Sequence, residues 1–310
     1  MSKLKDYMIA LRPWSFSASF TPVLLGSSLA YNDLESNKNL KFSYLIFVLC
    51  ALIALCVHGA ANLVNTYFDF KKGVDVKKSC SDRTLVDNIL KPEDVTKLGV
   101  ILYTAGSLMF MALLYLTNPS TEFILIVLYF GGLSLSFLYT GGIGFKYMAL
   151  GDLIIIITFG PVTVLFAYIA QMGNIIESEK QTIQLILLLK PLLYAIPLAV
   201  NTEGILHSNN ARDAVNDKKA GIVTVAIILG YTGSYIFYVL LLFVPYFILI
   251  VMAIKLSSWY LLPIITIPIA FKLEKEFRFN QLLDLPINTA KLNLTFGLLY
   301  VVACLVANRI

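Results

Sequence analysis

The chain has 310 residues, of which 58% are hydrophobic and only 14% charged, and its formal net charge is +5. Soluble domains are about 45–50% apolar and about 25% charged. The composition therefore excludes a soluble globular protein and indicates a polytopic membrane protein. We expect a single membrane domain over residues 1–310, because no stretch has the composition of a separate soluble domain.

Long uncharged apolar runs predict an all-α fold in which nine helices span the membrane, since a span needs about 20 apolar residues. They lie near residues 14–31, 43–65, 98–117, 122–140, 150–172, 184–205, 230–253, 257–272 and 291–308. The first follows Lys3, Lys5 and Arg12, like a signal peptide, but it lacks a clear small-residue cleavage site and further spans follow it. The run near 257–272 is the shortest.

Basic residues favour one set of loops. The amino terminus and the loops after the second, fourth, sixth and eighth spans hold most of the Lys and Arg residues. The opposite loops hold only Lys38, Lys41, Lys180, Lys255 and Arg309, and Lys190 is ambiguous. Basic loops tend to stay on the cytosolic side, so we expect the first set of loops to face the cytosol.

Two clusters of Asn and Asp stand at the ends of spans on this same face. The first lies in NLVNTYFDFKKGVDVKKSCSDR, residues 62–83, and the second in NNARDAVND, residues 209–217. Helical residues three, four or seven apart share a face, which groups Asn62, Asn65 and Asp69. The same spacing groups Asn210, Asp213 and Asp217. Asp75 lies off the first face, but Gly73 permits the chain to turn and bring it back.

Four carboxylates in one cavity repel one another, and a bound cation relieves that repulsion. Oxygen ligands favour Mg²⁺ or Ca²⁺ over zinc. We therefore predict that Asp69, Asp75, Asp213 and Asp217 hold a metal ion that carries a diphosphate, assisted by Asn62, Asn65 and Asn210. Basic side chains nearby suit phosphate oxygens, namely Lys71, Lys72, Arg83, Lys146 and Arg212.

The cysteines and histidines do not join these clusters. Cys50, Cys56, Cys80 and Cys304 show neither a disulfide framework nor zinc-ligand spacing. His58 and His207 are isolated, and we expect them to pack or to form hydrogen bonds.

Several longer sequence motifs narrow the range of possible functions. They are LRPWSFSASFTPVLLGSSLAY, NLVNTYFDFKKGVD, DRTLVDNIL, GGIGFKYMALGD, and EGILHSNNARD with DKKAGIVT. In these motifs the chain resembles the UbiA superfamily of intramembrane prenyltransferases over nearly its whole length. The motifs are most similar to those of the 1,4-dihydroxy-2-naphthoate branch and of its animal enzymes that make menaquinone-4. The general family motif is NxxxDxxxD, whereas Asn65, Asp69 and Asp75 have the longer spacing typical of the naphthoate branch.

The resemblance implies nine helices around a central cavity, with the Asp motifs at its cytosolic mouth and a lateral opening to the lipid bilayer. It implies Mg²⁺-dependent transfer of an isoprenyl group, by analogy geranylgeranyl, from its diphosphate to a naphthoquinol such as reduced menadione. The product would be menaquinone-4 (vitamin K2), made in the endoplasmic reticulum or Golgi. Arg83, Lys146 and Arg212 would contact diphosphate, with Lys71 a weaker candidate, and Tyr139 would lie near the reacting carbon.

Two other functions stay open from the residues alone. A transporter would place ionisable groups near the bilayer midplane, whereas the acidic motifs here lie at one interface. A non-catalytic lipid-binding regulator of a membrane partner is the other alternative. By family analogy that partner would be a sterol-synthesis reductase. No nucleic-acid partner is predicted.

Overall fold

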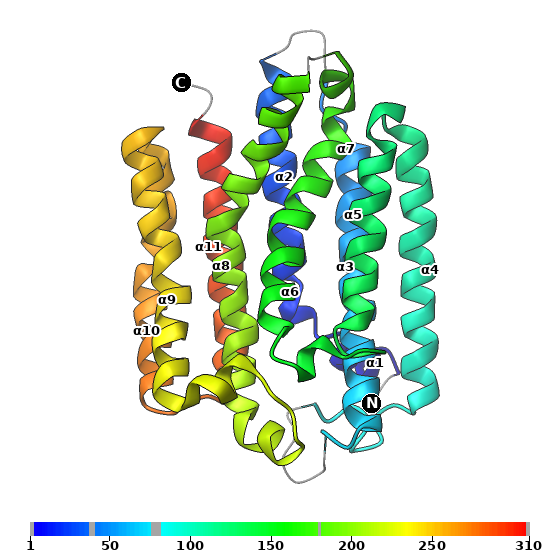
Figure 1. Ribbon diagram of the computed structural model, residues 1–310, viewed down its shortest axis with the longest axis vertical. Coiled ribbons are helices and arrows are strands. Elements are labelled where there is room, and N and C mark those ends of the chain that lie inside the picture. The colour runs from blue at the N-terminus through cyan, green and yellow to red at the C-terminus, as the bar shows by residue number, and fades with distance from the viewer. Residues whose placement is uncertain (1–2, 37–40, 76–81, 179–180, 308–310) are drawn as a thin grey trace.

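The computed structural model describes residues 3–36, 41–75, 82–178 and 181–307 (Figure 1). The predicted all-helical class is confirmed, because these ranges form a bundle of long helices and no β-strand. In chain order the helices are α1 (Lys3–Leu11), α2 (Ser17–Glu35), α3 (Tyr44–Lys71), α4 (Pro92–Leu116), α5 (Pro119–Leu138), α6 (Gly151–Ile157), α7 (Thr163–Ser178), α8 (Gln181–Lys219), α9 (Val225–Lys255), α10 (Ile267–Arg278) and α11 (Leu285–Ala307).

Local sequence signals start several of these helices. The side chain of Ser43 accepts a hydrogen bond from the backbone of Ile46 at the start of α3. Thr224 caps α9 in the same way, and Asn118 caps α5, with Pro119 at its first position. Such caps satisfy backbone N–H groups that have no partner within the helix. The apolar runs of α3, α5 and α9 therefore each begin at a defined residue.

Three of the predicted spans differ in detail from simple helices. The run near 150–172 is interrupted by a π-helical segment, Thr158–Val162, which contains Pro161 and separates α6 from α7. The run near 257–272 begins as a 3₁₀ helix, Ser258–Thr266, before α10. The run near 184–205 belongs to α8, which continues to Lys219 and so carries the second Asn/Asp cluster.

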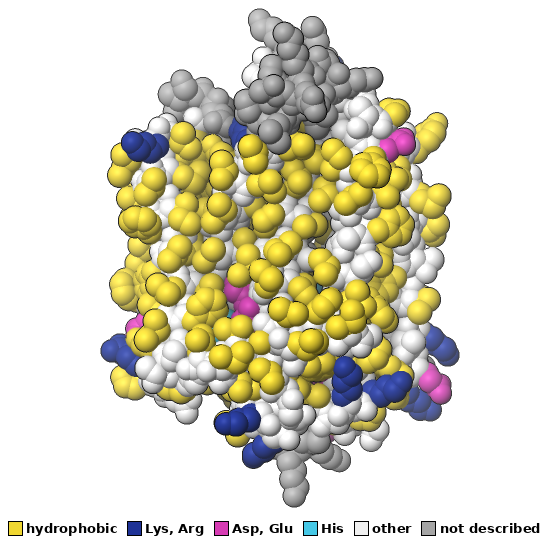
Figure 2. Space-filling view, viewed as in Figure 1, with side chains coloured by type: hydrophobic (Ala, Val, Ile, Leu, Met, Phe, Trp, Pro, Cys, Tyr) yellow, Lys and Arg dark blue, Asp and Glu magenta, His cyan; other side chains and the backbone are white. Residues whose placement is uncertain are grey.

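The molecule carries a broad apolar surface suited to lipid. In the described ranges, six helical segments are long and apolar enough to cross a membrane. Figure 2 shows a hydrophobic band over most of the visible face, with Lys and Arg side chains gathered at its edges. The protein is therefore an integral membrane protein, while the number of nine spans stays a prediction.

Close helix crossings fix the bundle interior. α2 packs against α7 and α11, and α8 packs against α9 and α11. A Cβ atom on Gly26 of α2 would lie only 2.2 Å from the carbonyl oxygen of Val164 in α7. Small residues allow helix backbones to approach in membranes, so this glycine sets the spacing between α2 and α7.

Candidate active site

The two Asn/Asp clusters meet at one end of the bundle. The carboxyl-terminal ends of α3 and α8 both lie at the bottom of Figure 1. Asp69 is in the last turn of α3, and the chain then turns at Gly73, whose φ is +71°, to reach Asp75. The sequence-based expectation that the two clusters share one end of the molecule is correct.

A polar pocket forms between these helix ends. It is lined by Arg12, Asn65, Asp69, Val74, Asp75, Asp82, Lys146, Asn209, Asn210, Asp213, Asn216 and Asp217. The four carboxylates predicted as metal ligands are all present, together with Asn65, Asn210 and Lys146 from the predicted substrate-binding set. Residues far apart in the sequence thus converge on one cavity.

Lys146 is the centre of the first hydrogen-bond network in this pocket. It is buried in a short 3₁₀ turn, Phe145–Tyr147. Its Nζ donates to Asp69 Oδ2 at 2.7 Å and to Asn65 Oδ1 at 3.2 Å. Tyr147 donates its hydroxyl to Asp69 Oδ1 at 2.8 Å. The ammonium of Lys146 therefore balances the charge of Asp69.

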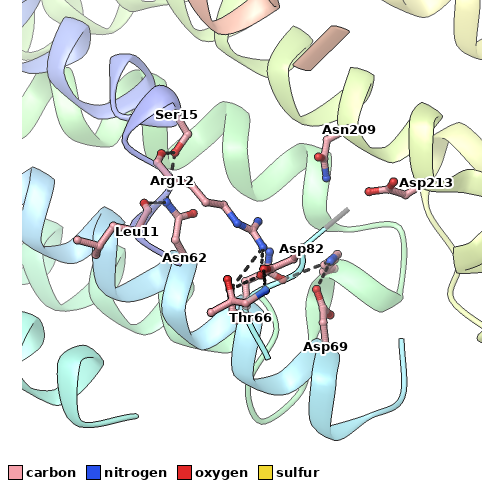
Figure 3. Close-up of polar contacts among 12 residues, drawn as sticks. Leu11, Arg12, Ser15, Asn62, Thr66, Asp69, Asp82, Asn209 and Asp213 are labelled. Atoms are coloured by element: carbon pink, nitrogen blue, oxygen red, sulfur yellow. Dashed lines mark hydrogen bonds and ion pairs between the residues drawn. The ribbon is translucent and has the colours of Figure 1, made fainter. Parts of the chain in front are cut away.

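Arg12 and Asp82 form a second network, which sequence reasoning did not assign to the site. Arg12 Nη2 donates to Asp82 Oδ2 at 2.6 Å, and the Thr66 hydroxyl donates to the same oxygen at 2.6 Å. The backbone N–H of Thr84 donates to Asp82 Oδ1. Figure 3 shows Arg12 reaching across to Asp82 and Thr66, with Asp69 close by. This network ties the amino-terminal segment to the loop after α3.

The second cluster presents Asp213 through a neighbouring arginine. Arg212 binds Asp213 through two hydrogen bonds, Nε to Oδ1 at 2.9 Å and Nη2 to Oδ2 at 2.7 Å. It also donates to Asn209 Oδ1 at 2.6 Å. Such a bidentate pair fixes the direction of the carboxylate. Arg212 itself lines a different groove, beside α9, so it orients Asp213 from behind the polar pocket.

Other predicted substrate-binding residues lie outside the polar pocket as the described residues form it. Asn62 donates to the Leu11 carbonyl at 2.9 Å and to Ser15 Oγ at 3.2 Å, and so fixes the entry to α2. Arg83 forms an exposed bidentate ion pair with Asp87. Lys71 lies over the Tyr67 ring at 5.7 Å. Contacts of Arg83 and Lys71 with diphosphate stay predictions.

Two further cavities continue from the polar pocket. The second shares Arg12, Asn65 and Asn209 with the polar pocket, and adds Trp14, Ser15 and Thr202 among its lining residues. The third is largely apolar and shares His58 and Phe159 with the second; Tyr139 is in its wall. We call this third cavity the apolar chamber. Shared walls place all three along one route from the carboxylates to the apolar interior of the bundle.

His58 stands at the junction of the second cavity and the apolar chamber. Its two ring nitrogens lie 3.3 Å from Ser15 Oγ and 3.0 Å from Ser19 Oγ. Its ring packs against Phe159 at 4.7 Å between centroids. The expectation that His58 forms hydrogen bonds is correct. With the hydroxyls of Ser15 and Ser19, its ring forms a polar constriction where the apolar chamber begins.

Electrostatics in the polar pocket differ between its acids. Burial, and next the charges of Asp69 and Asp82, raise the pKa of Asp75 to about 7. Burial alone would also raise the pKa of Asp82, but Arg12 and hydrogen bonds from Thr66 and Thr84 hold that pKa well below its usual range. Asp82 is therefore ionised across the physiological range, whereas Asp75 exchanges its proton near neutrality.

A divalent cation fits the donor set of this pocket. Every side chain that it offers as a ligand presents oxygen, and the buried Asn210 Oδ1 accepts no hydrogen bond from the described residues. Within the described ranges, no three Asp, Glu, His or Cys side chains converge as a ready-made metal site. Mg²⁺ needs fewer, because it usually binds one or two carboxylates, waters and substrate phosphates. The pocket thus suits Mg²⁺ bound together with a diphosphate.

Comparison with known proteins decides the family. A profile of the UbiA prenyltransferase family matches residues 19–306. The chain belongs to the UbiA prenyltransferase family. It is 54% identical over 306 residues to UbiA prenyltransferase domain-containing protein 1 of Danio rerio, covering 99% of this chain and 85% of that protein. It is 54% identical over 305 residues to the Homo sapiens protein of the same name, covering 98% and 85%.

Solved structures of UbiA homologues share the fold. A homologue from Aeropyrum pernix K1 superposes with a TM-score of 0.68 at 16% identity, covering 94% of this chain and 97% of that one. A homologue from Archaeoglobus fulgidus, bound to GPP and Mg²⁺, gives a TM-score of 0.53 at 15% identity, covering 96% and 99%. The protein is accordingly a UbiA-type membrane prenyltransferase.

Proposed function

We propose that this UbiA-family protein transfers an isoprenyl group, geranylgeranyl by family analogy, from its diphosphate to a naphthoquinol such as reduced menadione. The product would be menaquinone-4. The observation that carries the proposal is a route of three adjoining cavities, which share lining residues and lead from a carboxylate-lined polar pocket to an apolar chamber. A substrate with an anionic head and an apolar tail matches both ends of that route.

Mg²⁺ would be held by Asp69, Asp75, Asp213 and Asp217, with the Asn210 oxygen as a further donor. When bound, it neutralises charge on the diphosphate leaving group. Asp69 is engaged by Lys146 in the structure. We infer that Lys146 turns its ammonium from Asp69 to the diphosphate when the donor binds.

The residues of the chain then favour departure of the diphosphate. Lys146 and Arg12 bring positive charge to the pocket, and both are held in place by carboxylates. Preorganised charge of this kind is often the largest contribution to catalysis. The C–O bond of the donor breaks and its electron pair leaves with the diphosphate. The allylic cation that remains is shielded from water by the apolar chamber.

Aromatic rings surround the place where this cation would form. Phe159, Phe166 and Tyr129 line the apolar chamber. Each aromatic face stabilises a nearby cation by about 0.5–2 kcal/mol. The second cavity, with Trp14, Ser15 and His58 among its lining residues, offers both a flat aromatic surface and hydroxyl groups. We propose that the quinol ring lies there, with its nucleophilic carbon toward the apolar chamber.

We further propose that the Asp motifs face the cytosol, in an endoplasmic reticulum or Golgi membrane. The support is the concentration of Lys and Arg in the loops at the motif end. A protease that cannot cross sealed microsomes tests the orientation through a cleavage site inserted between Lys91 and Pro92. Cleavage from the cytosolic side is expected, and protection until the membrane is opened would contradict the orientation.

Reconstituted protein tests the proposed reaction. The protein in lipid vesicles is supplied with Mg²⁺, allylic diphosphates of several lengths and reduced menadione, and prenylated naphthoquinone is measured. We expect product with the wild type and none above background with Asp69→Asn, while Glu93→Gln, which changes an exposed acid at the start of α4, keeps full activity. Well-folded wild type that forms no product with any donor would refute the proposal. An Asp69→Asn variant of normal activity would refute the role given to the polar pocket.

A further inference from the structure

A second group of ionisable side chains lies inside the bundle, separate from the polar pocket. Asp152 in α6 is 5% exposed, and Glu203 and His207, one turn apart in α8, are each 0% exposed. Within the described ranges, no donor binds either carboxylate, and Nδ1 of His207 has no hydrogen-bond partner. The two carboxyl groups lie within hydrogen-bond reach of each other.

Such a group is costly in a membrane protein. Buried polar atoms are nearly always hydrogen-bonded, and exceptions call for an explanation. Ionisable residues inside membrane helices are rare and mark ion or proton pathways. Two adjacent carboxylates also cannot both ionise easily, because their charges repel. We therefore expect Asp152 and Glu203 to share one proton. A pair in this state can bind a second proton and later release it.

On one side this group meets the wall of the apolar chamber. Tyr139, at the end of α5, lines that chamber, and its buried hydroxyl has no hydrogen-bond partner among the described residues. A Cβ atom on Gly151 would lie 3.2 Å from the Tyr139 hydroxyl, so this hydroxyl packs directly against the residue before Asp152.

On the other side the group reaches a separate groove. His207 Nδ1 lies 3.6 Å from Asp152 Oδ1, and His207 Nε2 lies 2.8 Å from Ser234 Oγ in α9. Ser234 lines an open groove between α8, α9 and α10, together with Ala226, Gly230 and Phe277. Histidine placed between two such groups is suited to pass a proton from one to the other.

We propose that Asp152 and Glu203 take up the proton released by the aromatic acceptor, through Tyr139, and pass it by way of His207 and Ser234 to the groove. This inference rests on the proposed function, and it adds the fate of the acceptor proton. The donor C–O pair leaves with diphosphate, and a ring π pair forms the new C–C bond. The proton on that ring carbon moves to the Tyr139 oxygen while the Tyr139 proton moves to the carboxyl pair. The C–H pair then restores the aromatic ring.

Tyr139 is the catalytic residue in this scheme, because it lines the apolar chamber toward which the nucleophilic carbon of the quinol ring points. Asp152, Glu203 and His207 act through Tyr139 and are positioning residues. The rival proton acceptor is the departing diphosphate, which remains in the polar pocket. If diphosphate takes the proton, the carboxyl pair has no part in the rate of C–H cleavage, and this difference can be measured.

The test compares Asp152→Asn and Glu203→Gln with the control Glu274→Gln. The control removes a carboxylate that binds Tyr235 and Arg278 near the surface. Each variant is reconstituted in vesicles with Mg²⁺. Binding of a non-cleavable isoprenyl thiolodiphosphate, the rate of prenyl transfer to reduced menadione, and the isotope effect from deuterium at the reacting ring carbon are measured. A positioned general base contributes roughly 10²–10⁴-fold, so we expect each test variant to lose about 100-fold in rate.

Retained donor binding with a larger isotope effect than the wild type would support the proposal, because C–H cleavage has then become rate-limiting. An unchanged rate, or a slower rate with an unchanged isotope effect, would overturn it. If the variants do not fold, the infrared band of a protonated carboxyl in the wild type is measured instead at pH 9, where Asp75 has lost its proton. Absence of that band would overturn the proton shared by Asp152 and Glu203. Wild type that binds donor but prenylates no naphthoquinol would refute the proposed acceptor. In that case the infrared band would still test whether Asp152 and Glu203 share a proton.

Discussion

Replacing Lys146 with methionine should separate the role of this lysine in folding from its role in binding. Lys146 is 8% exposed, and its Nζ forms the 2.7 Å ion pair with Asp69. Burial would lower the pKa of Lys146, but Asp69 more than offsets this effect and raises it. The lysine is therefore charged at neutral pH, and methionine keeps much of its shape while removing that charge.

The magnitude follows from what the substitution leaves behind. Removing one partner of a buried ion pair costs about 3–5 kcal/mol, because the other charge stays buried without compensation. For Asp69, this predicts a fall in the thermal unfolding midpoint of the order of 10 °C without Mg²⁺. Mg²⁺ bound to Asp69 can replace the missing charge. A ligand at about 100 times its Kd stabilises by about 2.7 kcal/mol, so Mg²⁺ should restore most of the loss.

Thermal unfolding of the purified variant, followed by intrinsic fluorescence with and without Mg²⁺, measures both effects. Lys272→Met is the matched control, because Lys272 is 74% exposed and lies 3.9 Å from its partner Glu276. We expect the control to unfold like the wild type. A Lys146→Met variant that is as stable as the wild type without Mg²⁺ would contradict the charge balance assigned to this lysine. A variant that Mg²⁺ fails to rescue would contradict the placement of the cation beside Asp69.

Three further predictions concern the polar pocket and the helix packing. Asp75 takes up a proton as the pH falls through about 7, and protons compete with the metal for this carboxylate. The Mg²⁺ concentration for half-maximal transfer should therefore rise about tenfold from pH 8 to pH 6. If that concentration does not change with pH, Asp75 is not a ligand. Asp82→Asn leaves Arg12, whose side chain is 20% exposed, without its 2.6 Å partner. The variant should lose about 1–3 kcal/mol in thermal unfolding, whereas a wild-type midpoint would show that the pair contributes little. Gly26→Ala places a Cβ about 2.2 Å from the Val164 carbonyl, and overpacking of this kind costs about 1–3 kcal/mol; an unshifted midpoint would mean that α2 and α7 separate freely.

The sequence predicted the parts of the site that depend on short spacing. Asn65 and Asp69 share a helix face because they are four residues apart, and Gly73 marks the turn toward Asp75. Both can be read without knowing the fold. Lys146 was identified through a sequence motif. In the structure its Nζ donates a hydrogen bond to Asp69, which is 77 residues away in the chain.

The Arg12–Asp82 network could not be predicted in the same way. The two residues are 70 positions apart, and their pairing depends on how the amino-terminal segment lies across α3. Their sequence signals were ambiguous as well, because a basic residue before a first span usually reflects topology. Only the packed structure distinguishes a topological charge from one that is held in a binding pocket.

Asp152 and Glu203 were missed for a different reason. Both lie within predicted spans, where long apolar runs drew attention to hydropathy rather than to single charges. An ionisable residue inside a span is itself a functional signal. Applied to the sequence, that rule would have selected Glu203 within the run near 184–205. The structure adds what the rule cannot give, namely that Asp152 from another helix faces the same place.

α8 carries residues for both halves of the proposed reaction. Glu203, His207, Asn210 and Asp217 follow a spacing of four, three and seven residues, so they lie along one face of the helix, and all four are buried. The carboxyl pair and the diphosphate pocket are therefore positioned by one rigid element. A change that shifts α8 as a whole should alter donor binding and proton transfer together. Asp213→Asn, at the pocket end alone, should weaken donor binding and leave the isotope effect of the ring proton unchanged.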